Sequence, residues 1–189
     1  MTMLLVTPPG VEPMTLAEIK DYLRISSASE DDLLTGLIAT ARETVEKLTG
    51  TALVSQSWRL YLDDWPRQGI VRIPCYPAAS ITAVTAYGPE GDPSVIDAGD
   101  IFLDASSRPA RLYLASPAMA LRPLNGMEID FVAGFGEAGT DVPDGLRRAI
   151  KVLVAHCYEF RGAASAQDQP LSYPPGFDRL IAAWRRMAI

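Results

Sequence analysis

The spacing of apolar residues changes twice along this chain of 189 residues, and that change limits the folds it can adopt. In the first fifty residues, and again after Pro143, apolar residues recur every three or four positions. This is the period of an α-helix with one buried face. Between these segments they recur every second position, which is the period of a β-strand. We therefore expect helices at both ends of the chain around a β-rich block, an α+β fold.

The first fifty residues predict a pair of helices. Thr15 and Glu18 have the spacing of a capping box, so a short helix begins after Thr15 and ends near Arg24. A longer helix begins at Asp31 and ends at Gly50, the residue type that most often closes a helix. The short helix would not be stable alone in water, so the pair requires a packing partner. The apolar stripe of the longer helix consists of Leu33, Leu34, Leu37, Ile38, Ala41, Val45 and Leu48.

Strand periodicity fills the middle of the chain. Frequent prolines and glycines separate short alternating segments, and no insert is long enough for the helical crossover that parallel strands need. The block should therefore be a small antiparallel sheet or sandwich. The predicted strands are 54–62, 70–73, 81–87, 101–103, 111–114 and 127–133.

Helical periodicity returns from Pro143 to Phe160, and this helix can pack on the N-terminal pair. A flexible loop is expected at 162–174, followed by a last short helix after Gly176. We therefore divide the chain into three parts. They are an N-terminal helical hairpin at 1–52, a β-rich inserted block at 53–140, and C-terminal helices at 141–189 that pack on the hairpin.

Composition excludes several classes of protein. An apolar fraction of 48% can form a proper core, and no apolar run reaches the roughly 18 residues of a membrane span. The net charge of −6 disfavours tight binding to phosphates, so we expect no sequence-specific DNA binding. We expect neither a membrane-spanning protein nor a DNA reader.

One motif resembles a nucleotide site. Residues 134–139 read G-x-G-x-x-G directly after a predicted strand, as in dinucleotide-binding proteins. In such proteins a helix begins at the glycines, whereas here residues 140–143 intervene. Glu137 and Asp141 would also repel a pyrophosphate. We expect a plain turn and no cofactor.

The other chemically capable side chains also predict no active site or metal site. His156 is the one histidine and falls in an apolar helix, and Cys75 and Cys157 are too far apart in sequence to form a zinc-binding pair. The acidic pairs could in principle carry out acid-base or metal chemistry. We interpret them as solvated strand edges and turns; they are Asp63 with Asp64 and Glu128 with Asp130.

Taken in order, the motifs of this chain resemble the head-tail connector proteins, also called adaptor or head-completion proteins, of long-tailed phages and phage-derived gene transfer agents. Each motif is common by itself, and their order and spacing carry the resemblance. The matching segments are 15–20, 22–24, 31–34, 41–42, 49–53, 56–60, 73–74, 131–136, 142–143, 146–150 and 153–156.

The resemblance implies a structural protein and not an enzyme. Its subunits would form a ring of about twelve copies that joins the portal to a tail-proximal stopper or tail-completion protein. DNA would pass through the ring without sequence-specific contact. The protein would reside at the head-tail junction of the particle, and in the host cytoplasm before assembly.

The resemblance also implies an interface near the C-terminus, because a C-terminal segment of such connectors engages the portal. On this basis we expect Phe177, Trp184, Arg185 and Arg186 to contact the portal or a neighbouring subunit, since Trp and Arg are frequent in interface hot spots. The apolar members of this segment can equally complete the core.

Two other functions fit parts of the sequence. The β-rich block could make this chain a tail-completion or surface-binding module, which would bind tail proteins or glycans. A small hydrolase or nucleotide-binding enzyme would have to use residues 134–139 or the acidic pairs.

Overall fold

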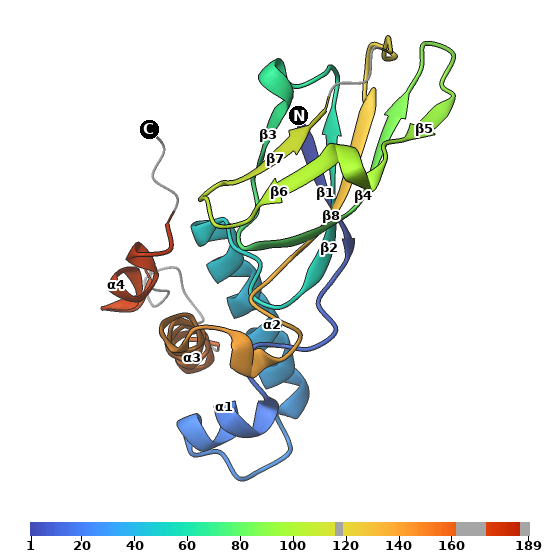
Figure 1. Cartoon of the computed structure of the whole chain (residues 1–189). Helices are drawn as coiled ribbons and strands as arrows, with labels where there is room; N and C mark the ends of the chain where they lie inside the picture. The colour runs from blue at the N-terminus through green and yellow to red at the C-terminus, as the bar shows by residue number, and fades with distance from the viewer. Residues whose placement is uncertain (116–118, 162–172, 186–189) are drawn as a thin grey trace. The chain divides into compact units, whose positions relative to one another are not determined.

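The computed structural model describes residues 1–115, 119–161 and 173–185, which form two compact units. The sheet unit comprises Met1–Gly10 and Ser55–Phe135, and the helical unit comprises Val11–Val54 and residues from Gly136 onward. Each unit is built from segments that are distant in sequence (Figure 1). The architecture confirms the predicted α+β class.

The helical unit contains α1 (Leu16–Leu23), α2 (Asp31–Thr49), α3 (Asp144–Glu159) and α4 (Phe177–Ala182). Helix α2 packs against α3, and α4 packs against both of them. At the end of α2, Gly50 has a φ of 66° and closes the helix as predicted, because glycine adopts the left-handed conformation without steric cost. The apolar faces meet in a core of Ile19, Leu34, Ile38, Ala41, Val45, Leu146, Ala149, Ile150, Leu153, Val154, Phe177 and Ile181.

The predicted capping box is present at the start of α1. The Glu18 backbone N–H donates to the Thr15 hydroxyl at 3.2 Å, and the Thr15 backbone N–H donates to the Glu18 carboxylate at 2.9 Å. Arg147 of α3 also donates to this carboxylate, at 2.6 Å. The hydrogen bonds from Thr15 and the nearby Arg147 outweigh partial burial and lower the pKa of Glu18 from its ordinary value. One carboxylate thus caps α1 and binds α3.

Glu18→Gln is expected to lower the free energy of unfolding at neutral pH by about 1 kcal/mol, because glutamine can keep the capping hydrogen bond but loses the negative charge that interacts with Arg147 and with the start of the helix. Because the pKa of Glu18 is lower in the folded chain, its stabilisation is complete above the unfolded pKa and is lost as the pH falls through the folded pKa. We therefore expect the free energies of unfolding of the unaltered chain and of Glu18→Gln, measured with urea from pH 7 to pH 3, to become equal at acid pH. The exposed Glu137→Gln serves as control, and an equal pH dependence of both variants would contradict this role.

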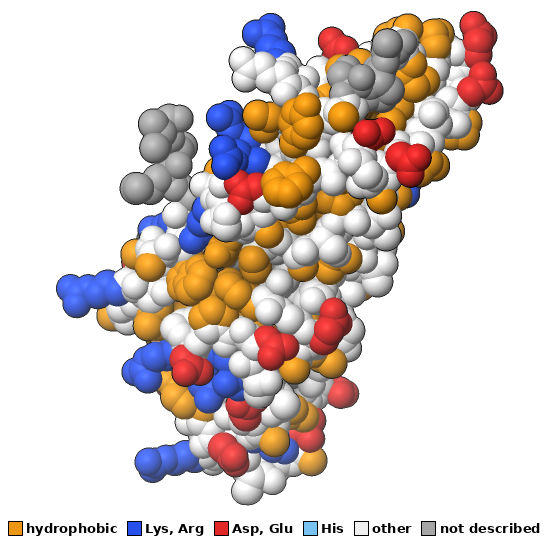
Figure 2. Space-filling view, in the orientation of Figure 1, with side chains coloured by type: hydrophobic (Ala, Val, Ile, Leu, Met, Phe, Trp, Pro, Cys, Tyr) orange, Lys and Arg blue, Asp and Glu red, His pale blue; other side chains and the backbone are white. Residues whose placement is uncertain are grey.

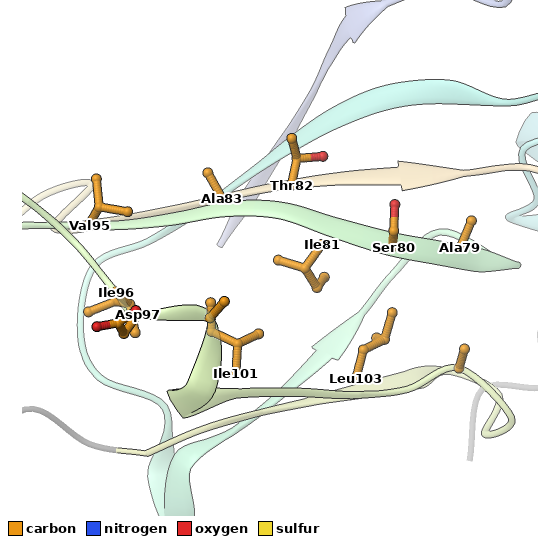
Figure 3. Close-up of a pocket in the computed structure, with 12 residues that line it drawn as sticks. Ala79, Ser80, Ile81, Thr82, Ala83, Val95, Ile96, Asp97, Ile101 and Leu103 are labelled. Atoms are coloured by element: carbon orange, nitrogen blue, oxygen red, sulfur yellow. The ribbon is translucent and has the colours of Figure 1, made fainter.

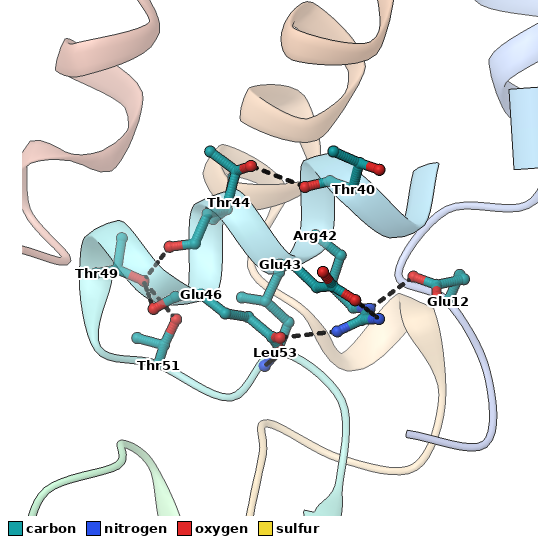
Figure 4. Close-up of polar contacts among 10 residues, drawn as sticks. Glu12, Thr40, Arg42, Glu43, Thr44, Glu46, Thr49, Thr51 and Leu53 are labelled. Carbon is teal, nitrogen blue, oxygen red and sulfur yellow. Dashed lines mark hydrogen bonds and ion pairs between the residues drawn. The ribbon is translucent and has the colours of Figure 1, made fainter. Parts of the chain in front are cut away.

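A buried arginine holds the segment before α1 against α2 (Figure 4). The Arg42 side chain is 9% exposed and lies 2.9 Å from a carboxylate oxygen of Glu12 and 2.9 Å from one of Glu46. The second oxygen of Glu46 accepts from the Leu53 backbone N–H at 2.8 Å. Burial works against the charge, but Glu12 and Glu46 raise the pKa of Arg42. These contacts bind three segments of the helical unit together.

The sheet unit contains two antiparallel sheets. The five-stranded sheet has the order β1-β2-β8-β4-β5 and the three-stranded sheet the order β3-β7-β6. The three-stranded sheet lies in front of the larger one in Figure 1. The strand bounds are β1 Thr2–Thr7, β2 Gln56–Leu62, β3 Ile70–Ile73, β4 Ala78–Tyr87, β5 Pro93–Val95, β6 Ile101–Asp104, β7 Ala110–Leu114 and β8 Met127–Ala133.

The core of the sheet unit follows from residue alternation. Every second residue of β8 is buried, from Met127 to Ala133, and β8 lies between β2 and β4. Phe131 is 1% exposed and stands opposite Trp58 of β2 and Ile81 of β4. The core also contains Leu60, Val71, Ile73, Val84, Ala86, Leu112, Leu114, Met127 and Ile129.

Two strands were not predicted. Residues 1–52 were expected to form only a helical hairpin, but Thr2–Thr7 form β1, which pairs with β2 in the sheet unit. The four consecutive apolar residues 3–6 lack the alternation that marks a half-buried strand. Strand β5 has three residues and begins with Pro93, which is tolerated at the start of an edge strand.

The acidic pair of β8 is not at a solvated edge as expected, because β8 is the central strand of its sheet. Arg59 of β2 donates to both carboxylate oxygens of Asp130, at 2.6 and 2.8 Å. Its guanidinium also lies 3.2 Å from Glu128. The hydrogen bonds to Asp130 raise the pKa of Arg59. The pair therefore helps to fix β2 against β8.

None of the helices in the described residues is long and apolar enough to cross a membrane.

Candidate interaction surfaces

The predicted C-terminal interface is divided between core and surface. Phe177 and Ile181 of α4 are fully buried in the helical unit. The Tyr173 ring stacks on Phe177, with ring centroids 5.0 Å apart and planes at 28°. Phe177 therefore anchors α4 in the core of the helical unit. This is the alternative role that the sequence allows for the apolar residues of this segment.

The residues after α4 are more accessible. Trp184 is half-buried, and the Arg185 side chain is 43% exposed and pairs with Asp178 at the start of α4. Arg186 lies outside the described residues. Most of the predicted loop at 162–174 also lies outside them. Of the four predicted contact residues, Trp184 and Arg185 thus lie at the described surface.

Strand β1 was not predicted as a surface, yet all six of its residues are exposed. It is an edge strand that pairs with β2 on one side. Met3 and Leu4 stand opposite Leu60 and Arg59, which lie on opposite faces of β2, so β1 presents apolar side chains on both faces. The exposed fractions are 36% for Met3, 54% for Leu4, 39% for Leu5 and 52% for Val6.

The outward face of the three-stranded sheet is a second apolar surface. Tyr113 of β7 stands opposite Ile70 of β3 and Phe102 of β6, so the three form one row across the sheet. Their exposed fractions are 50%, 42% and 68%, respectively. They line a hollow of about 540 Å³. Figure 2 shows apolar side chains exposed over this sheet beside charged ones.

A groove of about 820 Å³ lies between β4 and β6 (Figure 3). Ile81 comes from β4, and Ile101 and Leu103 come from β6. Among the described residues that line the groove, Asp97 is the one that carries a charge. A groove lined mainly by uncharged residues from two strands suits an extended apolar segment better than an anionic small molecule.

The glycine motif has the geometry of a turn. The Asp141 carboxylate accepts from the Ala138 backbone N–H at 2.9 Å and fills the space beside Gly136. Helix α3 begins only at Asp144. An acidic group thus occupies the place where a dinucleotide site would need space for a phosphate.

His156 lies in α3, and its ring meets the edge of Phe160 with centroids 5.0 Å apart. Asp63 accepts from the Asn125 backbone N–H at 3.0 Å and so supports a loop. Within residues 1–115, 119–161 and 173–185, no group of three His, Cys, Asp or Glu side chains is arranged to hold a metal ion.

Comparison with known proteins points to particle components. Residues 13–77 match the family model of phage gp6-like head-tail connector proteins. Three solved structures each match 100% of this chain and 97% of their own chain at 28% identity. They are the neck of an empty gene transfer agent particle computed with C6 symmetry (TM-score 0.81), the virion of the native particle (0.81) and the native neck computed with C12 symmetry (0.76).

No curated protein matches this chain. The family match covers α1, α2 and the first strands of the β block, and the structural matches extend the likeness to the whole chain. The resemblance inferred from the sequence is therefore confirmed: residues 13–77 match the phage gp6-like head-tail connector family, and the whole chain is similar to a chain of the gene transfer agent neck.

Proposed function

We propose that this protein is a structural subunit of a ring at the head-tail junction of a phage-like particle, where it joins the portal to tail-proximal proteins. One observation carries the proposal. The whole chain matches a neck chain of a gene transfer agent particle with a TM-score of 0.81. The C6 and C12 symmetries of the related necks support a cyclic arrangement of subunits. The work of such a protein is binding and not catalysis.

Charge supports the passage of DNA. Residues 1–142 carry ten basic and nineteen acidic side chains, whereas residues 143–189 carry seven and four. An acidic wall does not retain DNA, because binding to phosphates depends on basic side chains that neutralise them. A ring of mainly acidic subunits would therefore let DNA move through its centre without holding it.

The positive C-terminal region supplies the portal contact in this proposal. Trp184 and Arg185 combine a half-buried aromatic ring with an exposed cation, the side-chain types that dominate interface energetics. Phe177 contributes by holding α4 in the helical unit. Arg186 belongs to the proposed contact on the basis of sequence.

Arg185→Glu is expected to weaken binding to the portal about tenfold or more, because a reversed charge at an interface opposes its partner. Removing the whole segment would be a poor test, since it would expose the core around Phe177. The measurement is a pull-down of the full chain with the portal protein of the same particle.

Arg179→Glu is the matched control, because it reverses an exposed charge within α4 itself. It should leave portal binding within about twofold of the unaltered chain. If Arg185→Glu and Arg179→Glu bind the portal equally well, the proposed contact between the C-terminal segment and the portal is wrong. Failure of the unaltered chain to bind portal would contradict the function itself.

A further inference from the structure

The edge strand β1 lacks the features that keep edge strands from pairing with other chains. Natural edge strands are usually protected by charged residues, prolines or a covering element. Residues Thr2–Thr7 contain no charge and no proline, and all six are exposed. Within the part of the chain that the structure describes, the strand therefore has one edge without a partner strand, and it presents apolar side chains on both faces. Such a strand can pair with the exposed edge strand of a sheet in another chain.

At the opposite side of the same sheet, part of β4 has no second partner strand among the described residues. Strand β4 pairs with β5 only from Thr85 to Tyr87, and its stretch Ala79–Ala83 has β8 as its partner strand on one side. Two bulges interrupt the β8 pairing here, as is common where a strand edge is open. Strand β6 is likewise an edge strand. The groove of about 820 Å³ lies between these two edges.

The strand and the groove match in length and chemistry. A strand advances about 3.3 Å per residue, so the six residues of β1 span slightly more than the five residues 79–83. Figure 3 shows Ile81 on β4 facing Ile101 and Leu103 across the groove. The apolar side chains of β1 would meet this lining, and no unpaired charge of β1 would be buried.

Strand β1 cannot fill the groove of its own chain. It is hydrogen-bonded to β2 from Thr2 to Thr7, and the order β1-β2-β8-β4 places three strand spacings between β1 and β4. At about 4.8 Å per spacing, the separation is about 14 Å. The two surfaces therefore lie at opposite edges of one sheet.

We propose that β1 of one subunit lies in the β4–β6 groove of the next subunit and continues its sheet across the ring. This inference rests on the proposed ring. A ring with cyclic symmetry requires two different complementary surfaces on each subunit, and one repeated head-to-tail contact then closes it. Strand β1 and the stretch 79–83 of β4, which lies beyond the β5 pairing, supply such a pair. A second copy of this chain is thus the occupant, because the complementary strand is present on every copy.

The test is disulfide cross-linking between two singly substituted full-length chains. One carries Leu4→Cys in β1 and the other carries Thr82→Cys in the groove, and both positions are exposed. The chains are mixed with portal, and rings are verified by negative-stain microscopy before mild oxidation. Only a contact between β1 and the groove of a different copy can link the two variants through these cysteines.

A Leu4→Cys and Thr82→Cys mixture should give at least about tenfold more linked dimer than one in which Leu124→Cys replaces the groove variant. Leu124 is 73% exposed and lies in the same unit, outside the groove. Rings without this enrichment would overturn the inference and leave the proposed function intact. Absence of both rings and portal binding would overturn both.

A second pair of variants tests the contact without cysteine chemistry. Leu4→Asp should reduce ring formation about tenfold or more, because a carboxylate would be buried in a groove whose lining is mainly uncharged and already contains the acidic Asp97. Leu124→Asp, at a 73% exposed site outside the groove, should leave it unchanged. Circular dichroism verifies that both variants are folded. Normal rings from a folded Leu4→Asp chain would contradict the inference.

Discussion

Phe131→Ala is expected to lower the free energy of unfolding of the sheet unit by about 3–5 kcal/mol, the usual cost of removing a buried phenylalanine. Phe131 is 1% exposed and lies in the central strand β8, between Trp58 and Ile81 of the neighbouring strands. Its removal would leave a cavity that the flanking strands cannot close without losing their pairing. Urea unfolding followed by tryptophan fluorescence measures the loss.

Phe102→Ala is the matched control for this substitution. Phe102 is the same residue type in the same unit, but it is 68% exposed. Its replacement should change the free energy of unfolding by no more than about 0.5 kcal/mol. Similar losses for Phe131→Ala and Phe102→Ala would show that the core is not organised around β8.

Arg42→Ala is expected to cost the helical unit about 2–4 kcal/mol. The substitution removes the guanidinium that lies 2.9 Å from the Glu46 carboxylate, whose side chain is 13% exposed. Breaking a buried ion pair costs about 3–5 kcal/mol, and the expected value is lower because the Glu12 side chain is 31% exposed and can regain water. The substitution also removes the hydrogen bond from Arg42 to Glu12, which holds the segment before α1 against α2. Thermal unfolding measures the effect.

Glu43→Ala is the control within the same cluster. The Glu43 side chain is 70% exposed and its carboxylate lies 3.4 Å from Arg42. An exposed pair contributes little, so the variant should lose less than about 0.5 kcal/mol. A loss as large as that of Arg42→Ala would mean that the net charge of the cluster matters and the buried geometry does not.

The helices could be predicted from sequence because their determinants are local. A capping pair such as Thr15 and Glu18, or a terminal glycine such as Gly50, acts within a few residues, and the apolar stripe of α2 identifies its buried face. Strands with clear alternation, such as β8, were also found at their observed bounds. Strand order could not be predicted, because it depends on pairings between residues far apart in sequence.

The sequence was less informative about interfaces. It identified a C-terminal cluster of aromatic and basic residues, but it could not separate the buried Phe177 from the exposed Arg185, since burial depends on where α4 packs. It missed β1 and the β4–β6 groove altogether. The signal for β1 was present in the uninterrupted apolar run at 3–6, which has no polar face to turn toward water.

Electron cryomicroscopy of particles that contain this protein tests the central claim most directly. The proposed function predicts a ring of copies of this chain between the portal and the tail, with DNA passing through its centre. The related necks computed with C6 and C12 symmetry indicate that such a ring can be resolved by symmetry averaging. A neck without density for this chain, or with the chain bound elsewhere on the particle, would contradict the account.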